Sequence, residues 1–159
     1  LYAQRMTERL NKFLPTASEA LQLAARSQHI CRWEIPRADY PLGRKGYNQW
    51  RAALKDLHAE KAAGILERLD YDAETINRVK FLIKKRQLKR DAETQALEDV
   101  ICLVFLDYYF LPFADKHTDE KVIDILQKTW RKMSEKGQSA ALKLSFDEKA
   151  MKLIQGALE

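Results

Sequence analysis

The chain has 159 residues, a net charge of +5, and a composition that is 46% hydrophobic and 32% charged. This length fits one domain, so we expect residues 1–159 to form a single helical domain with its own core. No uninterrupted apolar stretch reaches the roughly 20 residues of a membrane-spanning helix, which argues against membrane insertion. The first residues lack a signal-peptide pattern, and because residue 1 is Leu we expect the natural protein to extend further N-terminally.

Few turn formers, 5 Gly and 4 Pro, accompany apolar residues at helical spacing almost throughout the chain. This pattern predicts an all-α fold, a bundle of about seven helices. The first helix should end at about Leu14, and Thr16 with Glu19 should form a capping box for a second helix over 17–33. The segment 34–46 contains two Pro and two Gly and should be irregular.

For the remaining helices, the sequence predicts several starts and one end. The third should begin near Tyr47, and the sixth should end at Gly137. The side chains expected to cap the later helices are Asp72, Asp91, Thr118 or Asp119, and Ser145 with Glu148.

Cys31 and Cys102, the only two cysteines, both fall inside predicted helices. Two separated thiols form neither a disulfide framework nor a zinc cluster, so we interpret both as buried and reduced in a cytoplasmic protein. The modest positive charge favours anionic partners. Nucleic acid is an alternative that this charge does not favour, because nucleic-acid-binding domains are usually more strongly basic.

Two histidines within predicted helices, His29 and His58, are candidate functional residues, although a lone helical His is more often structural. Gln95, Glu98, Asp99 and Cys102 follow helical spacing and form a polar stripe on an otherwise apolar helix. Adjacent carboxylates are costly to bury unless cations or donors meet them. Two interpretations stay open here: a salt bridge to Arg5, Arg32 or Lys84, and a functional site.

A basic run comprises Lys80, Lys84, Lys85, Arg86, Lys89 and Arg90. Such a run is usually a solvated helix face. The functional alternative is a phosphate cradle, to which Arg32, Arg37, Arg44 and Arg51 could add planar guanidinium donors. Trp33, Tyr40, Tyr47 and Trp50 bracket the same region, where they could stack on a base or hold the long loop against the bundle.

The blocks QHICRWEIPR (28–37) and LEDVICLVFL (97–106) resemble a bacterial and fungal family of domains of unknown function. The likeness covers nearly the whole chain. Some members carry a glutamyl-tRNA synthetase label, but this sequence lacks a nucleotide-binding strand–loop–helix and the length for a synthetase core.

The helix order is also similar to that of the HD phosphohydrolase superfamily, in which His and Asp residues hold a divalent metal that activates water. AARSQHICRW is similar to that superfamily's AALLHDIGK segment, YAQRM to its HxxRV segment, and QALEDVICL to its DADxL segment. The resemblance implies an HD-like bundle and puts four residues at the metal-ligand positions: Tyr2, Gln28, His29 and Ile101. Three of these are not metal ligands, so we expect no bound metal and no other cofactor.

A shifted alignment would instead recruit His29, His58 with Glu60, and Asp99, which keeps a metal-dependent phosphohydrolase as an alternative. His58 and Glu60 are two apart on a helix, so their side chains diverge by about 200° and are poorly placed to hold one ion.

The sequence therefore predicts an HD-like bundle with a remodelled central pocket that binds or acts on a small anion, such as a nucleotide or a phosphorylated metabolite. Helices two and five should pack side by side, so that Gln28, His29 and Arg32 face Glu98 and Asp99. His58 and Lys84 should lie at the pocket's rim and, with Gln28 and Arg32, bind the ligand.

In a catalytic version of the site, His29 would be the general acid or base, because its free pKa lies near neutrality. Asp99 would orient His29, and Glu98 would be the second catalytic carboxylate. Arg32 would neutralise the ligand. The rival class is a non-enzymatic module whose basic run binds RNA or an acidic protein surface. The oligomeric state is left open.

Overall fold

The computed structural model describes residues 1–159 and contains nine α-helices and no strand, so the prediction of an all-α protein is confirmed. The helices are α1 (Tyr2–Phe13), α2 (Glu19–Arg26), α3 (Gly43–Arg68), α4 (Ala73–Ile83), α5 (Ala92–Val104), α6 (Phe110–Asp115), α7 (Asp119–Lys132), α8 (Glu135–Ala141) and α9 (Glu148–Leu158). A π-helical segment, Phe105–Tyr109, joins α5 to α6. None of these helices has both the length and the apolar character needed to span a bilayer.

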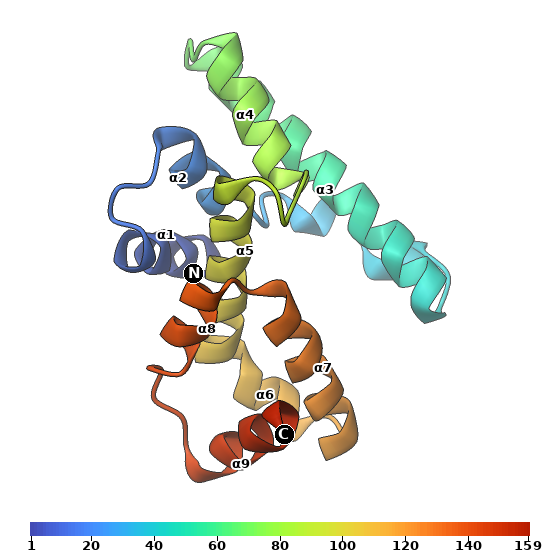
Figure 1. Ribbon diagram of the computed structural model, residues 1–159. Helices are drawn as coiled ribbons and strands as arrows, with labels where there is room; N and C mark the ends of the chain where they lie inside the picture. The colour runs from blue at the N-terminus through green and yellow to red at the C-terminus, as the bar shows by residue number, and fades with distance from the viewer.

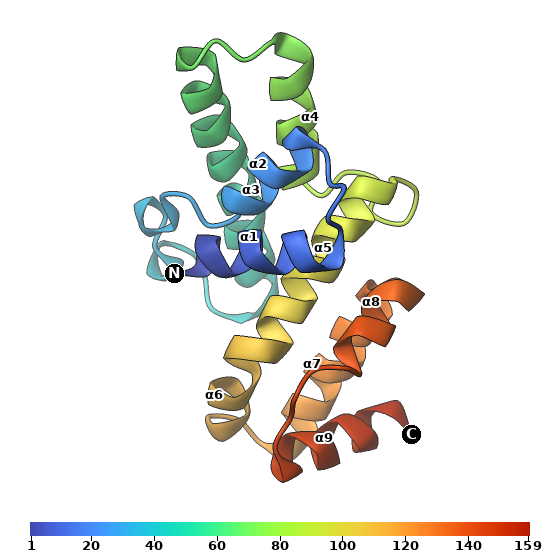
Figure 2. The same cartoon turned by 90° about the vertical axis from the view of Figure 1, so that its left-hand side faces the viewer.

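Helix α5 runs through the middle of the molecule, between two groups of helices (Figure 1). Helices α1 to α4 share an apolar core with α5, which contributes Leu97, Val100 and Val104 to it. The later helices form a second core around the C-terminal part of α5, which contributes Leu103. Figure 2, turned by 90°, shows the same division, so α5 is the element common to both cores.

Side-chain capping explains where several helices begin. Asp72, Asp91 and Thr118 each accept a hydrogen bond from a backbone N–H in the first turn of their helix, at 2.7–3.4 Å. Such a bond satisfies a donor that has no partner within the helix. These three predicted helix starts are confirmed.

Three other predicted starts are wrong. Helix α3 begins at Gly43, within the segment predicted to be irregular, rather than near Tyr47. Helix α2 is capped by Ser18, whose hydroxyl accepts from the backbone N–H of Leu21, so Thr16 with Glu19 forms no capping box. Helix α9 is capped by Asp147 rather than by Ser145. In α2 and α9 the acceptor that caps the helix lies two residues beyond the predicted one, and both residue types suit the position.

The count of nine helices also differs from the predicted seven. Pro112 follows the π-helical segment, and because proline disfavours an unbroken α-helix through its position, the apolar stretch is divided into α5 and α6. Helix α7 ends at Lys132, and Ser134 caps a separate helix α8, where the sequence had predicted one helix ending at Gly137. Helix α2 is shorter than predicted.

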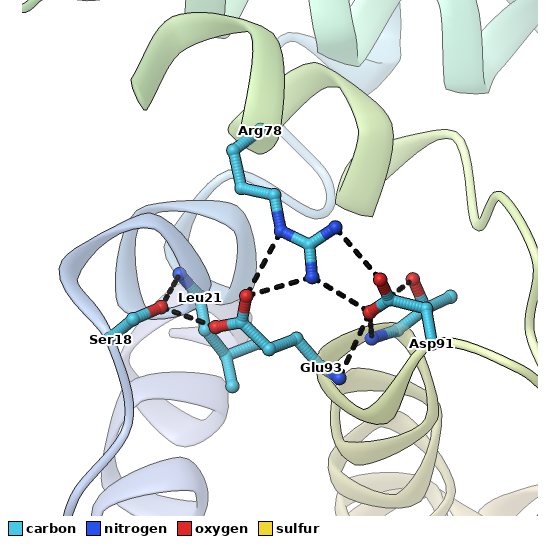
Figure 3. Close-up of polar contacts among 6 residues, drawn as sticks. Ser18, Leu21, Arg78, Asp91 and Glu93 are labelled. Carbon is cyan, nitrogen blue, oxygen red and sulfur yellow. Dashed lines mark hydrogen bonds and ion pairs between the residues drawn. The ribbon is translucent and has the colours of Figure 1, made fainter. Parts of the chain in front are cut away.

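Helices α2, α4 and α5 meet at one charged network (Figure 3). The Arg78 guanidinium on α4 donates to both carboxylate oxygens of Asp91 at 2.8 Å and to Glu93 at 2.8 and 3.0 Å. Asp91 caps α5, and the hydroxyl of Ser18, the cap of α2, donates to Glu93. Bidentate guanidinium–carboxylate contacts fix both distance and angle, so this network sets how the two helix starts face each other.

Hydrogen bonds to Asp99 connect the start of α8 to α5. Its carboxylate accepts hydrogen bonds from the Ser134 backbone N–H at 2.8 Å, from the Ser134 hydroxyl, and from the Gln95 amide at 3.0 Å. Gly137 lies directly against it: a Cβ atom at this position would be 2.6 Å from the Asp99 Oδ1 atom. The approach of α8 to α5 therefore depends on the missing side chain at Gly137.

We expect Gly137→Ala to lower the free energy of unfolding by about 1–2 kcal/mol, because the added methyl group must displace a hydrogen-bonded carboxylate. Gly64→Ala on α3 is the matched control, since no atom lies within 4 Å of its added Cβ. It should raise the free energy of unfolding by about 0.5–1 kcal/mol through helix propensity. Urea denaturation measures both, and stabilisation by Gly137→Ala would contradict the close contact.

Candidate functional site

A pocket of about 450 Å³ lies beside α5, between the two groups of helices. Its charged lining consists of Arg32, Arg51, Lys85, Lys132 and Glu98. These residues come from the link after α2, from α3, from the link after α4, from the end of α7 and from α5. We call this the central pocket, and its volume falls in the range of about 300–1,000 Å³ that is typical of small-molecule sites.

One wall of the central pocket is apolar. Ile101 on α5, Phe105 in the π-helical segment and Ile125 on α7 contribute to it. π-Helical segments occur frequently at functional sites, because the wider turn changes which side chains face a cavity. An occupant would therefore meet cations on one side and an apolar surface on another.

A smaller cavity of about 30 Å³ adjoins the central pocket and shares Tyr2, His29 and Ile101 with it. Gln28 and His58 line only this inner cavity. Its volume suits one or two water molecules rather than an organic ligand.

His29 supports Arg32. An Arg32 guanidinium N–H donates to His29 Nε2 at 3.1 Å, and the His29 ring stacks on Tyr2 with 3.8 Å between ring centroids. Arginine has no acceptor, so Nε2 must be the unprotonated nitrogen of a neutral ring. Burial, assisted by the positive charge of Arg32, lowers the pKa of His29 to about 3. A ring held neutral in this way is a poor general acid at neutral pH.

His58 is buried and does not lie at the rim where the sequence placed it. Its Nδ1–H donates to the carbonyl oxygen of Ile30 at 2.7 Å. Trp50 Nε1–H likewise donates to the carbonyl oxygen of Ile35 at 2.9 Å. These bonds from α3 hold the link between α2 and α3, which carries His29 and Arg32, in place.

Glu98 lines the central pocket and pairs with Lys85, whose Nζ atom lies 3.0 Å from Glu98 Oε2. Lys85 adopts a left-handed backbone conformation, with φ of 55°, immediately after the end of α4. It is the left-handed residue of a helix C-cap, in which the Arg86 N–H donates to the Phe81 carbonyl oxygen at 3.3 Å and the Lys85 N–H to that of Leu82 at 3.0 Å. This conformation turns the chain so that Lys85, rather than Lys84, reaches the pocket.

Two residues of the predicted site lie elsewhere. The Asp99 carboxylate is bonded to Ser134 and Gln95, and it is absent from the lining of the central pocket. The Lys84 Nζ atom lies 3.8 Å from Asp56 on α3, also away from the pocket. Asp99 was assigned to the site from the polar stripe of its helix, but it is one residue from Glu98, and one step along a helix turns a side chain by about 100°. Lys84 was assigned from the basic run, in which the next residue, Lys85, is the one that lines the pocket. The predicted contact between α2 and α5 is present.

The central pocket contains more cations than acids. Four basic side chains line it, and Lys85 alone among them has an acidic partner, Glu98. Burial and repulsion from Arg51 lower the pKa of Arg32. Burial and repulsion from Lys85 and Arg51 do the same to Lys55, which lines the inner cavity. Like charges held this close favour binding of an anion that relieves their repulsion.

Most of the basic run is occupied by contacts within the chain. Lys80 pairs with Glu60 at 3.2 Å, and the Lys89 ammonium donates to the carbonyl oxygens of Arg131 and Lys132 at 3.0 and 3.2 Å. Only Lys80 of the run lies on a helix, because α4 ends at Ile83 and α5 begins at Ala92, so the run is not the solvated helix face of the simpler interpretation.

No group of three or more His, Cys, Asp or Glu side chains comes together in an arrangement that could hold a metal ion. His29 and His58 lie 6.2 Å apart between ring centroids. Cys102 lines the central pocket, but burial, together with the charge of Glu98, raises the pKa of its thiol to about 12. The thiol is therefore protonated at neutral pH and a weak nucleophile.

Only part of the lining of the central pocket could be predicted from the sequence. Arg51 was included among the arginines that could bind phosphate, and Lys85 was included in the basic run, but neither was assigned to the site. Lys132 was missed, because it is an ordinary basic residue near a helix end. Only the packing of α7 beside α5 brings it to the pocket.

Because the pKa of His29 is low, the free energy of unfolding should depend on pH. An unfolded chain protonates this ring near pH 6.5 and the folded protein near pH 3, so the free energy of unfolding falls as the pH drops below 6.5. His29→Phe keeps a ring against Tyr2 and removes the titration. We expect wild type to lose about 1–2 kcal/mol more than this variant between pH 7.5 and 5.0, measured by urea denaturation. Equal losses would show that His29 is not held neutral.

Comparison with known proteins assigns the chain to a family. No curated protein and no solved structure matches it. A family model matches residues 1–154, nearly the whole chain, and it is described as Domain of unknown function (DUF4202). Both sequence blocks, 28–37 and 97–106, fall inside the matched range. The chain therefore belongs to the DUF4202 family of domains of unknown function.

Proposed function

We propose that this protein is an HD-like helical domain that binds a small phosphorylated ligand in its central pocket. The observation that carries this proposal is the unbalanced charge of the pocket: Arg32, Arg51 and Lys132 face it without an acidic partner. Guanidinium groups bind phosphate through paired N–H donors, and such charge-assisted hydrogen bonds are among the strongest in proteins. A nucleotide or a phosphorylated metabolite has the required charge.

The HD-like part of the proposal is supported by which residues come together. The resemblance aligns Tyr2, Gln28, His29 and Ile101 with metal-ligand positions, and these residues come from three distant segments of the chain. All four line the inner cavity. If the helices follow the HD arrangement, the residues at these four positions must lie around one cavity.

The residues at these positions do not fit a divalent metal. Ile101 has no donor atom, and the lone pair of His29 Nε2 is taken by Arg32. The Gln28 amide donates to the carbonyl oxygen of Ala24 at 3.0 Å. Burial raises the pKa of Tyr2, which keeps its hydroxyl protonated. Arg51 and Lys85 also line the inner cavity, and their charge repels a cation.

Ligand binding can be tested with inorganic phosphate, pyrophosphate and a panel of phosphorylated metabolites by isothermal titration calorimetry. We expect Arg32→Ala and Arg51→Ala each to weaken phosphate binding by about 10- to 100-fold, the loss expected for one charge-assisted hydrogen bond. Arg44→Ala, on the exposed first turn of α3, is the matched control and should bind as wild type does.

The same variants separate binding from architecture. Arg32 has no acidic partner, so its removal leaves no stranded carboxylate, and the free energy of unfolding should change by no more than about 1 kcal/mol. A much larger loss of stability, with no phosphate binding by wild type, would contradict the proposal and make Arg32 a structural residue.

The metal-dependent phosphohydrolase is the alternative from the same fold class. Since the donor set does not fit a metal, we expect elemental analysis of the purified protein to find far less than one Mn, Fe or Zn per chain. About one ion per chain would favour the hydrolase over the binding domain.

A further inference from the structure

Glu98 is a buried carboxylate whose Oε2 atom is ion-paired but receives no aligned hydrogen bond. The residue is 3% exposed, and its Oε2 atom is buried with no hydrogen bond. Lys85 provides charge at 3.0 Å but not the alignment of a hydrogen bond. The next residue, Asp99, receives donors from Ser134 and Gln95. The chain therefore satisfies one of two adjacent carboxylates and leaves the other facing the central pocket.

Two neutral donors of the pocket lining are already used within the chain. The hydroxyl of Thr129 donates to the carbonyl oxygen of Ile125 at 2.8 Å, and the Cys102 thiol is directed at the carbonyl oxygen of Thr129. Buried polar atoms in native proteins nearly always have partners, and an exception at a cavity wall indicates a partner that arrives with a ligand. A donor on an occupant of the pocket would complete Glu98.

The surrounding charge restricts what kind of donor this can be. An ammonium group would be repelled by Arg32, Arg51 and Lys85, whereas a hydroxyl group is neutral and donates equally well. Two neighbouring hydroxyls can address both oxygens of one carboxylate, and acidic side chains bind the hydroxyls of ribose in this way in dinucleotide-binding folds.

We infer that Glu98 is the specificity-determining residue of the central pocket and selects a sugar phosphate, free or as part of a nucleotide. This inference rests on the phosphate binding proposed for the pocket. The phosphate lies at the unpaired arginines, and the sugar hydroxyls donate to Glu98. Inorganic phosphate alone leaves Glu98 unsatisfied and adds a second negative charge beside it, so it binds more weakly than the sugar ester.

The test compares inorganic phosphate, ribose 5-phosphate and 2-deoxyribose 5-phosphate by isothermal titration calorimetry on wild type and Glu98→Gln. Wild type should prefer ribose 5-phosphate over inorganic phosphate at least tenfold. In Glu98→Gln, which keeps the size and removes the charge, phosphate should bind more tightly and ribose 5-phosphate more weakly, so that the preference falls by at least tenfold. Glu120→Gln, an exposed site on α7, is the matched control and should keep the wild-type preference.

The deoxy sugar tests the same contact on unmodified protein, even if Glu98→Gln fails to fold. Wild type should bind it several-fold more weakly than ribose 5-phosphate, and folded Glu98→Gln should distinguish the two far less. Adenosine 5′-monophosphate distinguishes the two sources: tighter binding than ribose 5-phosphate, with the same dependence on Glu98, identifies a nucleotide, and weaker binding identifies a free sugar phosphate.

Three outcomes would overturn the inference. If wild type binds inorganic phosphate as tightly as ribose 5-phosphate, the pocket binds phosphate but Glu98 does not select the sugar. If Glu98→Gln changes both affinities by the same factor and in the same direction, Glu98 acts on charge alone. If neither protein binds any of these phosphates, the proposed function fails, and this inference fails with it.

Discussion

Burial of two adjacent carboxylates on the central helix is the constraint on which the rest of the structure depends. Glu98 and Asp99 are 3% and 1% exposed, on a helix that supplies apolar residues to both cores. An ionised group in such a place is costly unless donors or cations meet it. Asp99 receives its donors from Ser134 and Gln95, which brings α8 against α5. Glu98 receives the charge of Lys85, at the edge of a pocket rich in cations.

Much of the fold could be predicted because local chemistry decides it. Three predicted helix starts are confirmed because in each the capping side chain reaches a free backbone N–H group. These caps are Asp72, Asp91 and Thr118. The division between α7 and α8 could not be predicted by the same means. Whether α7 continues past Lys132 depends on the bonds that Ser134 makes to a carboxylate 35 residues earlier in the chain. Periodicity within a helix carries no information about such a contact.

The candidate site, too, could be predicted from the sequence only in part. Helical spacing identified Glu98 as a polar residue in an apolar stretch. His29 and Arg32 were predicted to lie within the second helix, and they lie in the link beyond α2 instead. All three line the central pocket. Spacing could not separate Asp99 from Glu98, because their different directions matter only once α8 and the link after α4 are in place. The pKa of His29 is set by burial and by Arg32, and neither influence is visible in the sequence, so the ordinary value near neutrality does not apply in the fold.

A crystal structure of the wild-type protein grown with saturating phosphate would show directly whether the central pocket binds an anion. We expect density for a tetrahedral anion in the central pocket, within hydrogen-bond distance of the Arg32 and Arg51 guanidinium groups. We also expect Arg32 to keep its bond to a neutral His29. A pocket that holds only water at saturating phosphate, or a divalent metal beside His29 and His58, would contradict the proposed function.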